Sequence, residues 1–428
     1  MTNSRRDFLK IVGTTTGGML VLPKFLSAMP TAELQTGFAA GRNVLVCIQL
    51  NGGNDGLNTF IPYDTPQYYA LRKSIGIPKE QVLKAAEGGM GWHPIMKGFA
   101  DMQQAGNMSV VQNVGYPNPN RSHFRSMEVW QTGSASNEYL NNGWLGRYLD
   151  ATCKGDDPLG ALNIDSIDNL ALRGSANHAL TMSDPQRFER QLKVLKEDRD
   201  DPINENPNLD FVRKLMIGSF DGSGQIKAAL EKSKLTPPQY PKHGLAQNLA
   251  WISRMIKGGL PTPVFYTGMG SFDTHAGQLG KHQTLLKELS ESVKAFYDDM
   301  RASGLLGNVT VMIFSEFGRR VRDNGTGTDH GAAAPVFVVG GNNSGKIIGS
   351  NPNLSDLVNG DLKHQFDFRS LYATILSQKL GVEPSKAGIP QEILRGIFWA
   401  TYRSMQNGNR VCLGCRFFVF VFSFFVKI

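Results

Sequence analysis

The sequence predicts an α/β fold, a doubly wound and mostly parallel sheet with helices on both faces. Several strand-length runs are apolar throughout, which is typical of strands covered on both faces of a parallel sheet. Helical patterns separate these runs, and strands that alternate with helices favour the doubly wound class. With 428 residues, the chain is long enough for one large domain of this kind or two smaller ones.

Each predicted strand is bordered by a turn-rich or polar segment, such as NGGNDG after the first strand. The first strand is NVLVCIQL, and NVTVMIFSEF has the strongest strand pattern in the chain. In chain order, strands are predicted at 43–50, 108–115, 262–268, 308–317 and 334–341.

Three further segments have helical character. The segment 283–305 places Leu285, Leu289 and Val293 at helical spacing, directly before the strongest strand. The segments 93–106 and 367–381 each end at a glycine, as many helices do.

Residues 1–40 are predicted to be a twin-arginine export signal. The pair Arg5–Arg6 is followed by a moderately apolar stretch and then by small residues, with cleavage expected within 28–40. Such signals are read by the twin-arginine export machinery, which makes that machinery an expected partner. The mature protein is therefore expected in the periplasm or outside the cell.

The rest of the chain is predicted to form one α/β domain at 41–400 with an insertion, followed by a tail. Residues 183–245 are rich in charge and proline, which indicates a helical, solvent-exposed insertion. The tail at 401–428 ends in an apolar run at 411–428, whose uninterrupted part of about ten residues is too short for a membrane-spanning helix. Three interpretations of this run stay open: an edge strand, a segment that binds an exported protein partner, or a sequence artefact.

The charge and the cysteines exclude several classes of function. The net charge of +8 lies partly at the two ends of the chain, and no basic stripe interleaved with aromatic residues is present, so a nucleic-acid partner is not expected. Cys412 and Cys415 form one CxxC pair without a second pair, and Cys47 lies in an apolar run typical of a small core residue. A single CxxC pair is weak evidence for zinc and does not place a redox fold, and a disulfide framework is not indicated.

Polar side chains gather where the predicted strands end or begin. They are Asp55; Arg121, Ser122, His123 and Arg125; Asp273 and His275; Glu316; and the pair Asp329–His330. Because ligands of open α/β sheets bind at the carboxyl ends of the strands, we expect these segments to converge on one rim.

The side chains on this rim have the chemistry of a metal site. We predict Asp55, Asp273, His275, Glu316, Asp329 and His330 as ligands of a divalent metal; zinc, manganese, calcium and magnesium are not distinguishable. Ser122, at the expected start of a helix, together with Arg121 and Arg125, is predicted to be catalytic, because helix N-termini and guanidinium groups both bind anions.

Structural interpretations compete with these roles. Ser122 suits a helix N-cap as well as a nucleophile, and Asp55 suits a turn residue. Asp329 is either a ligand or an acid that orients His330. The arginines between the last two strands, Arg319, Arg320 and Arg322, are interpreted as solvated surface.

Long motifs in one order resemble domain-of-unknown-function family 1501. They are NGGNDGLNTFIPY, GYPNPNRSHFRSMEVWQTG, NGWLGRYLD, FDTHAGQ, FSEFGRRVRDNGTGTDHGAAAPVFVVGG and DFRSLYATIL, and the resemblance covers roughly 43–398. The family commonly carries twin-arginine signals and is similar to the alkaline phosphatase and sulfatase superfamily. The resemblance therefore implies an alkaline phosphatase-like fold with metals at the strand ends.

The resemblance also implies roles for individual residues. Asp55 matches a metal-binding aspartate, Ser122 the nucleophile, Asp273 and His275 an Asp…His ligand set, and His330 a late histidine ligand. Glu316 ends the strand that normally ends in Asp-His. Phe317 stands where that histidine would be, so one nitrogen ligand is expected to be missing.

Two functions follow from the sequence. The first is a metal-dependent hydrolase that acts outside the cytoplasm on a phosphate or sulfate ester, either a small anionic ester or a sulfated or phosphorylated polymer. The second is a non-catalytic exported binding protein that keeps the hydrolase fold, as the phenylalanine at 317 and the apolar tail suggest.

Overall fold

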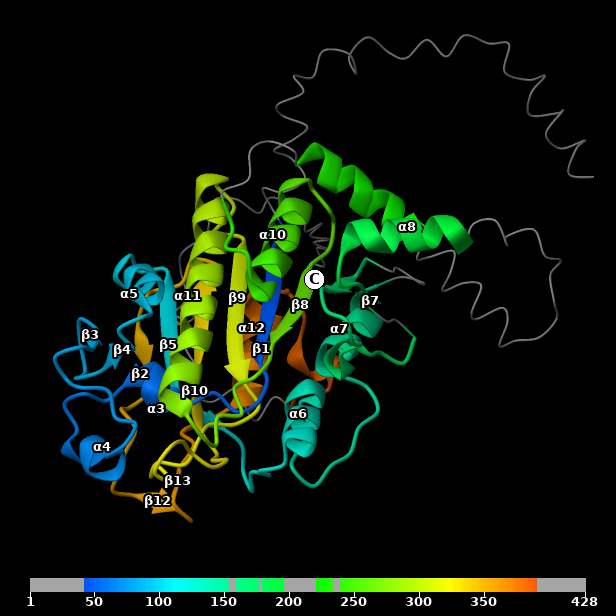
Figure 1. The fold of residues 1–428 in the computed structure, drawn as a ribbon. Coiled ribbons are helices and arrows are strands. Elements are labelled where there is room, and N and C mark those ends of the chain that lie inside the picture. Colours follow the sequence, from blue (N-terminus) through cyan, green and yellow to red (C-terminus); the bar gives the residue numbers. More distant parts are fainter. Residues whose placement is uncertain (1–41, 154–158, 177–178, 196–220, 234–238, 391–428) are drawn as a thin grey trace, which may run out of the picture.

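The computed structural model describes residues 42–153, 159–176, 179–195, 221–233 and 239–390. A central sheet forms the middle layer of this part of the chain (Figure 1). Its strands are β1 (Val44–Leu50), β5 (Met108–Gly115), β6 (Ala161–Asn163), β7 (Leu180–Thr181), β8 (Val264–Met269), β9 (Val309–Ser315), β10 (Ala334–Gly340), β11 (Ile347–Ile348) and β14 (Phe366–Asp367).

The sheet is mostly parallel, as predicted, and one central strand runs the other way. The strand order is β11-β5-β10-β9-β1-β8-β6-β7, with β14 also paired to β5. Strand β1 is parallel to β8 and β9, whereas β10 is antiparallel to both β5 and β9. The chain therefore enters β10 at the same edge where β1, β5, β8 and β9 end. The five predicted strands are confirmed as β1, β5, β8, β9 and β10.

Helices cover both faces of the sheet, and the three predicted ones are confirmed as α5, α11 and α12. Helix α11 begins at Gln278, earlier than its apolar pattern indicated. The helices that flank the sheet are α5 (Lys97–Gln104), α6 (His123–Thr132), α7 (Trp144–Thr152), α8 (Pro185–Leu195), α10 (Gly244–Lys257), α11 (Gln278–Ala302) and α12 (Phe368–Gln378).

Two apolar layers hold the helices to the sheet. One layer packs the sheet against α5, α10 and α11, and the other packs it against α6, α7 and α12. In Figure 1, α10 and α11 cross in front of the strands and α12 lies behind them. Strand β1 contributes side chains to both layers: Val46 and Ile48 pack in the first layer, and Leu45 and Cys47 pack in the second. This double burial explains why the strands read as continuous apolar runs.

The segment predicted as a helical insertion is helical where it is described, in α8 and at 221–232. Ile226 and Leu230 of the latter helix are buried in the first apolar layer. Within the described residues, no helix combines the length and apolarity needed to span a membrane. The predicted export signal and the tail with Cys412 and Cys415 lie outside the described residues.

A third apolar cluster, which includes Leu57, Tyr68, Val321 and Leu362, packs several short elements together. Short elements complete the fold. They are α3 (Gly56–Thr59), β2 (Phe60–Ile61), α4 (Pro66–Leu71), β3 (Leu83–Lys84), β4 (Gly91–Trp92), η1 (Leu170–Leu172), the hairpin of β12 (Leu357–Val358) and β13 (Asp361–Leu362), and η3 (Pro384–Ala387).

Candidate functional site

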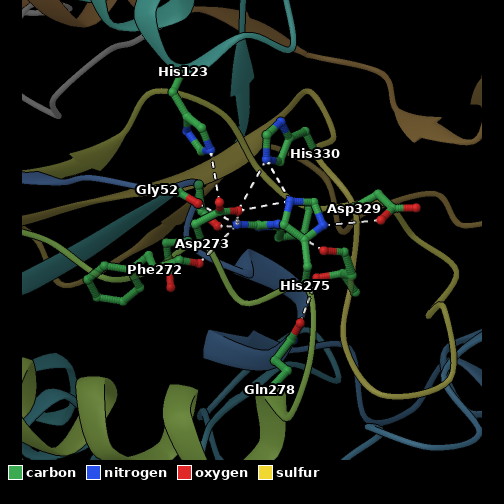
Figure 2. A network of polar contacts seen from close by, with 12 residues as sticks. Gly52, His123, Phe272, Asp273, His275, Gln278, Asp329 and His330 are labelled. Carbon is green, nitrogen blue, oxygen red and sulfur yellow. Dashed lines mark hydrogen bonds and ion pairs between the residues drawn. The ribbon is translucent and has the colours of Figure 1, made fainter.

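Three histidines and an aspartate meet at the carboxyl edge of the sheet (Figure 2). His123 is the first residue of α6, Asp273 and His275 follow β8, and His330 precedes β10. We call His123, Asp273, His275 and His330 the histidine cluster. Sequence segments far apart are brought together because parallel strands end, and the reversed strand begins, at the same edge.

Asp273 is the centre of the cluster. Its Oδ1 atom lies 3.0 Å from Nε2 of His275 and 3.2 Å from Nε2 of His330, and its Oδ2 atom lies 3.5 Å from Nε2 of His123. Arg319 approaches the same carboxylate, with Nη2 at 2.6 Å from Oδ1. Burial raises the pKa of Asp273, but its contacts with Arg319 and His330 outweigh burial and lower the pKa to about 2. The carboxylate is therefore charged at neutral pH.

Each imidazole is oriented through its Nδ1 atom. The Nδ1 atom of His330 lies 2.7 Å from the carbonyl oxygen of Arg121, and that of His275 lies 3.2 Å from Oδ1 of Asp329. The Nδ1 atom of His123 lies 2.8 Å from Oε1 of Glu316. Carbonyl and carboxylate oxygens only accept hydrogen bonds, so we infer that all three Nδ1 atoms carry protons. In the neutral rings, the Nε2 lone pairs then face the middle of the cluster.

These inward nitrogens fit a bound cation. The Nε2 atoms of His275 and His330 are 2.9 Å apart, where two bare lone pairs would repel each other. The Nε2 atom of His123 is buried and has no hydrogen-bond partner among the described residues. Ligand atoms of His123, Asp273 and His330 lie within 4.8 Å of one another. An outward Nδ1–H held by an oxygen and an inward Nε2 is the usual arrangement of metal-binding histidines.

Glu316 lies behind the ring of His123 and does not face the centre of the cluster. Its side chain is fully buried, and its Oε1 atom accepts a hydrogen bond of 2.8 Å from the backbone N–H of Gly52 besides contacting His123. The hydrogen bond to Glu316 raises the pKa of His123. Gly52 has φ +115°, and a Cβ atom there would lie 2.5 Å from the backbone nitrogen of Asp273. The glycine thus lets β1 approach the cluster closely.

Phe317 is packed against the cluster. Its buried ring lies 4.9 Å, between centroids, from the rings of both His123 and His330. A Cβ atom at Gly53, which has φ +75°, would come within 2.4 Å of the Phe317 ring. The phenylalanine fills the position where the resemblance implied a histidine, while His123 brings an imidazole to the same place from α6. His123 was expected on the rim but not as a ligand, and its position directly after Ser122 was the signal in the sequence.

The prediction that Arg319 is solvated surface is wrong. Its side chain is fully buried, and its Nε and Nη1 atoms donate to the carbonyl oxygens of Gly53 and Thr328 at 2.7 and 2.8 Å. Its Nη2 atom donates to Asp273 and to the carbonyl of Phe272. A guanidinium group can be buried when all its donors find acceptors, and Arg319 joins the three loops that carry the site. Arg322 is exposed, as predicted, whereas Arg320 is only partly exposed.

Besides Glu316, two of the predicted ligands lie outside the cluster. Asp55 is buried beside Arg72, 2.5 Å between Oδ2 and Nη1, and its Oδ1 atom caps α3 by accepting from the N–H of Asn58. Asp329 is exposed and contacts only the outer nitrogen of His275 and the amide of Asn324. The structure thus brings together Asp273, His275 and His330 of the predicted ligands, with Glu316 and Asp329 behind two of the rings.

The residues predicted to be catalytic lie in different surroundings. Ser122 occupies the N-cap position of α6, but its exposed side chain makes no capping hydrogen bond. The guanidinium group of Arg121 donates to Asp361, with Nε at 2.9 Å from Oδ2. Arg125 is directed elsewhere: it binds the carbonyl oxygen of Ser136 at 3.0 Å and stacks on Tyr139.

A family model described as "Protein of unknown function (DUF1501)" matches residues 103–388 of the chain. The matched region includes the whole histidine cluster as well as β5, β8, β9 and β10, whereas β1 and its loop precede it. No curated protein matches the sequence.

Solved structures with some likeness to this chain include hydrolases. The phosphonate monoester hydrolase of Silicibacter pomeroyi is 9% identical, with a TM-score of 0.37, over 82% of this chain and 74% of that one. The PsFucS1 sulfatase from Pseudoalteromonas is 11% identical, with a TM-score of 0.36, over 86% and 71%. The C-terminal periplasmic domain of EptC from Escherichia coli is 8% identical, with a TM-score of 0.36, over 82% and 87%.

Proposed function

We propose that this chain, which belongs to the DUF1501 family, is a metal-dependent hydrolase of phosphate or sulfate esters. The observation that carries the proposal is the set of three imidazoles whose Nδ1 atoms are held by oxygens while their Nε2 atoms converge on Asp273. Mixed imidazole and carboxylate ligands of this kind suit zinc and other divalent metals.

His123, Asp273, His275 and His330 would hold the metal ion. When bound, such an ion polarises ester oxygens and lowers the pKa of a coordinated water. Glu316, Asp329 and the carbonyl of Arg121 would keep each ring oriented, and Arg319 would keep the carboxylate of Asp273 in place.

Ser122 and Arg121 are the side chains we propose for contact with the ester. The Ser122 hydroxyl is exposed and not used for capping, so it can attack phosphorus or sulfur while the ester oxygen leaves as an alcohol. Water would then release the phosphate or sulfate from the serine. Arg121 lines the cavity beside the cluster and would bind non-bridging oxygens. Arg125 is engaged by backbone carbonyls, which argues for a structural role.

Metal analysis tests the proposal most directly. The purified protein is expected to contain a divalent metal and to hydrolyse 4-nitrophenyl phosphate or 4-nitrophenyl sulfate. His123→Ala and His330→Ala should each lose both the metal and the activity. His243→Ala is the matched control, because this histidine lies at the start of α10 outside the cluster. A metal-free wild-type protein, or variants that keep their metal, would overturn the proposal.

The serine is tested separately. Ser122→Ala should keep its metal content but lose at least about 10³-fold in kcat if the hydroxyl is the nucleophile. An unchanged kcat would indicate that water, and not Ser122, attacks the ester. It would not argue against the metal site. Metal binding without hydrolysis of any phosphate or sulfate ester would favour the alternative, a non-catalytic exported binding protein.

We further propose that the protein acts in the periplasm or outside the cell after export through the twin-arginine pathway. The sequence around Arg5 and Arg6 supports this. Replacing both by lysine should retain the protein in the cytoplasm of a bacterial host, as should deletion of the translocase in that host. Export that is unaffected by either change would rule this route out.

A further inference from the structure

An open cavity of about 570 Å³ lies beside the histidine cluster. His275 and His330 form part of its wall, so whatever enters the cavity meets the cluster at one side. A volume of this size suits a small organic molecule better than a single inorganic anion. Its lining residues are Arg121, His275, Arg320, Arg322, Asp323, Asp329, His330 and Gly360.

Two of the three arginines are fixed in the cavity wall by one buried carboxylate. Asp361 has a side chain that is 3% exposed, and it binds Arg121 through Oδ2 and lies 3.8 Å from Nε of Arg320 through Oδ1. Arg320 also donates to the carbonyl oxygen of Asn359. Both guanidinium groups are therefore held in position before any ligand binds.

The hairpin of β12 and β13 supplies these anchors. Its two turn residues, Asn359 and Gly360, have φ +52° and +82°, as a type I′ turn requires. The carbonyl oxygen of Gly360 accepts a hydrogen bond from the N–H of Val321, which docks the hairpin on the loop that follows β9. The hairpin thus places the arginine anchors next to the loop that carries His330.

Arg322 is the third arginine of the cavity wall, and it has no acidic partner among the described residues. Its guanidinium group is exposed and makes no ion pair or hydrogen bond with another described residue. The acidic residues in the same wall already have partners, since Asp323 accepts from the N–H of Ser74 at 2.8 Å and Asp329 contacts His275. No acidic side chain of the described residues forms an ion pair with Arg322, so its guanidinium group can bind an anion that enters the cavity.

We infer that this cavity binds a second anionic group of the substrate, a carboxylate, sulfate or phosphate on the same small molecule as the group at the histidine cluster. Arg322 is the specificity-determining residue, and Arg320 forms the fixed wall against which the second anion rests, whereas Arg121 is kept for the reacting ester. The inference rests on the proposed function, because it takes the histidine cluster as the position of the reacting ester. It adds the substrate class: a small ester with two separated negative groups.

Equilibrium binding tests the inference without hydrolysis. Phenylphosphonate and 4-phosphonobenzoate differ by one carboxylate and lack an ester bond, and their affinities for the metal-loaded protein can be measured by calorimetry. We expect 4-phosphonobenzoate to bind about 10-fold more tightly, because a charge-assisted hydrogen bond to arginine is of that size. Arg322→Gln should abolish this preference while leaving the affinity for phenylphosphonate unchanged.

Arg301→Gln is the matched control, since Arg301 is an exposed arginine at the far end of α11. It should keep the full preference. Equal affinities of the wild-type protein for the two compounds, no binding of 4-phosphonobenzoate, or a preference that survives in Arg322→Gln would each overturn the inference.

Hydrolysis separates this inference from the proposed function. A preference for 4-phosphonobenzoate without hydrolysis of phenyl phosphate, 4-carboxyphenyl phosphate or the two corresponding sulfates would support the second anion site and rule out the proposed activity. Hydrolysis of both phosphate esters with equal kcat/KM, together with no binding preference, would support the proposed activity and rule out the second anion site.

Discussion

Asp55 has the sequence position of a metal ligand but the contacts of a structural residue. Its carboxylate and the guanidinium group of Arg72 are both buried, and Gln278 donates to the same oxygen. Burial raises the pKa of Asp55, but the charge and hydrogen bond of Arg72 outweigh burial and bring it below its ordinary value. The lone pairs that a metal would need are therefore already engaged.

Asp55→Ala is expected to destabilise the protein without removing its metal. The change leaves the Arg72 charge buried and unpaired, which typically lowers the free energy of unfolding by about 3–5 kcal/mol. Urea denaturation measures that loss, and elemental analysis measures the metal. His330→Ala should show the opposite pattern. Loss of metal with little change in stability would instead make Asp55 a ligand.

The sequence predicted part of the histidine cluster because position along a strand is readable from apolar runs. Asp273, His275 and His330 were expected on one rim for that reason. The inward direction of His123 was not predictable, because it depends on Glu316 and on packing against Phe317. The same limit applies to Arg319, whose acceptors come from loops distant in the sequence.

Among the elements, the β12–β13 hairpin is one of several short ones that the strand and helix patterns missed. Its strands are only two residues long, too short to show an alternating pattern. The dipeptide Asn359–Gly360 between two short apolar stretches is nevertheless the strongest local signal for a tight hairpin. That signal could have located the hairpin that carries Asp361, but not the contacts of Asp361 with Arg121 and Arg320, which come from segments distant in the sequence.

A substitution in this turn should disturb both the hairpin and the cavity wall. Gly360→Ala forces a side chain into φ +82° and places its Cβ atom 2.7 Å from Nη1 of Arg320. Positive φ alone costs roughly 1–2 kcal/mol for a residue other than glycine, so the free energy of unfolding should fall by more than that.

Gly304→Ala is the control for backbone strain, because Gly304 has φ +70° and a Cβ atom added there would meet no neighbouring atom within 4 Å. Denaturation of the two variants in parallel isolates the effect of the Arg320 contact. Equal losses of stability would show that Arg320 moves aside freely and is not fixed by the hairpin.

For the whole molecule, the class of the sheet was predictable and the direction of one strand was not. Residues of β10 are buried on both faces, like those of its parallel neighbours, so its apolar run is the same in either direction. Only the length of the connection from β9 to β10, which contains no helix in the structure, distinguishes a reversed strand from a parallel one.

Stability of the whole fold should decrease in mild acid. Burial lowers the pKa of both His93 and His282 to about 4, whereas histidines in an unfolded chain titrate near 6.5. Above pH 6.5 neither state binds these protons. Between pH 6.5 and 4 mainly the unfolded state binds them, so the free energy of unfolding falls by up to about 3 kcal/mol per histidine.

Urea denaturation at pH 7.5, 6 and 5, with metal removed by a chelator, measures this effect. His282→Gln should reduce the pH dependence, since the contribution of one buried histidine is gone. Stability that stays constant between pH 7.5 and 5, or an unchanged slope in His282→Gln, would contradict the assignment.

The reversed direction of β10 has a further consequence for the rate of ligand binding. The chain leaves the sheet edge after Ser315 and returns to it at Ala334. Backbone hydrogen bonds join the two ends of the loop between these residues. The N–H of Gly318 donates to the carbonyl of Ala332 at 2.8 Å, and that of Arg320 to the carbonyl of Asp329 at 2.9 Å. Folding has thus already restricted the loop, so little conformational entropy remains to be lost on binding. A receptor of this kind should capture its ligand at a rate set by encounter rather than by rearrangement.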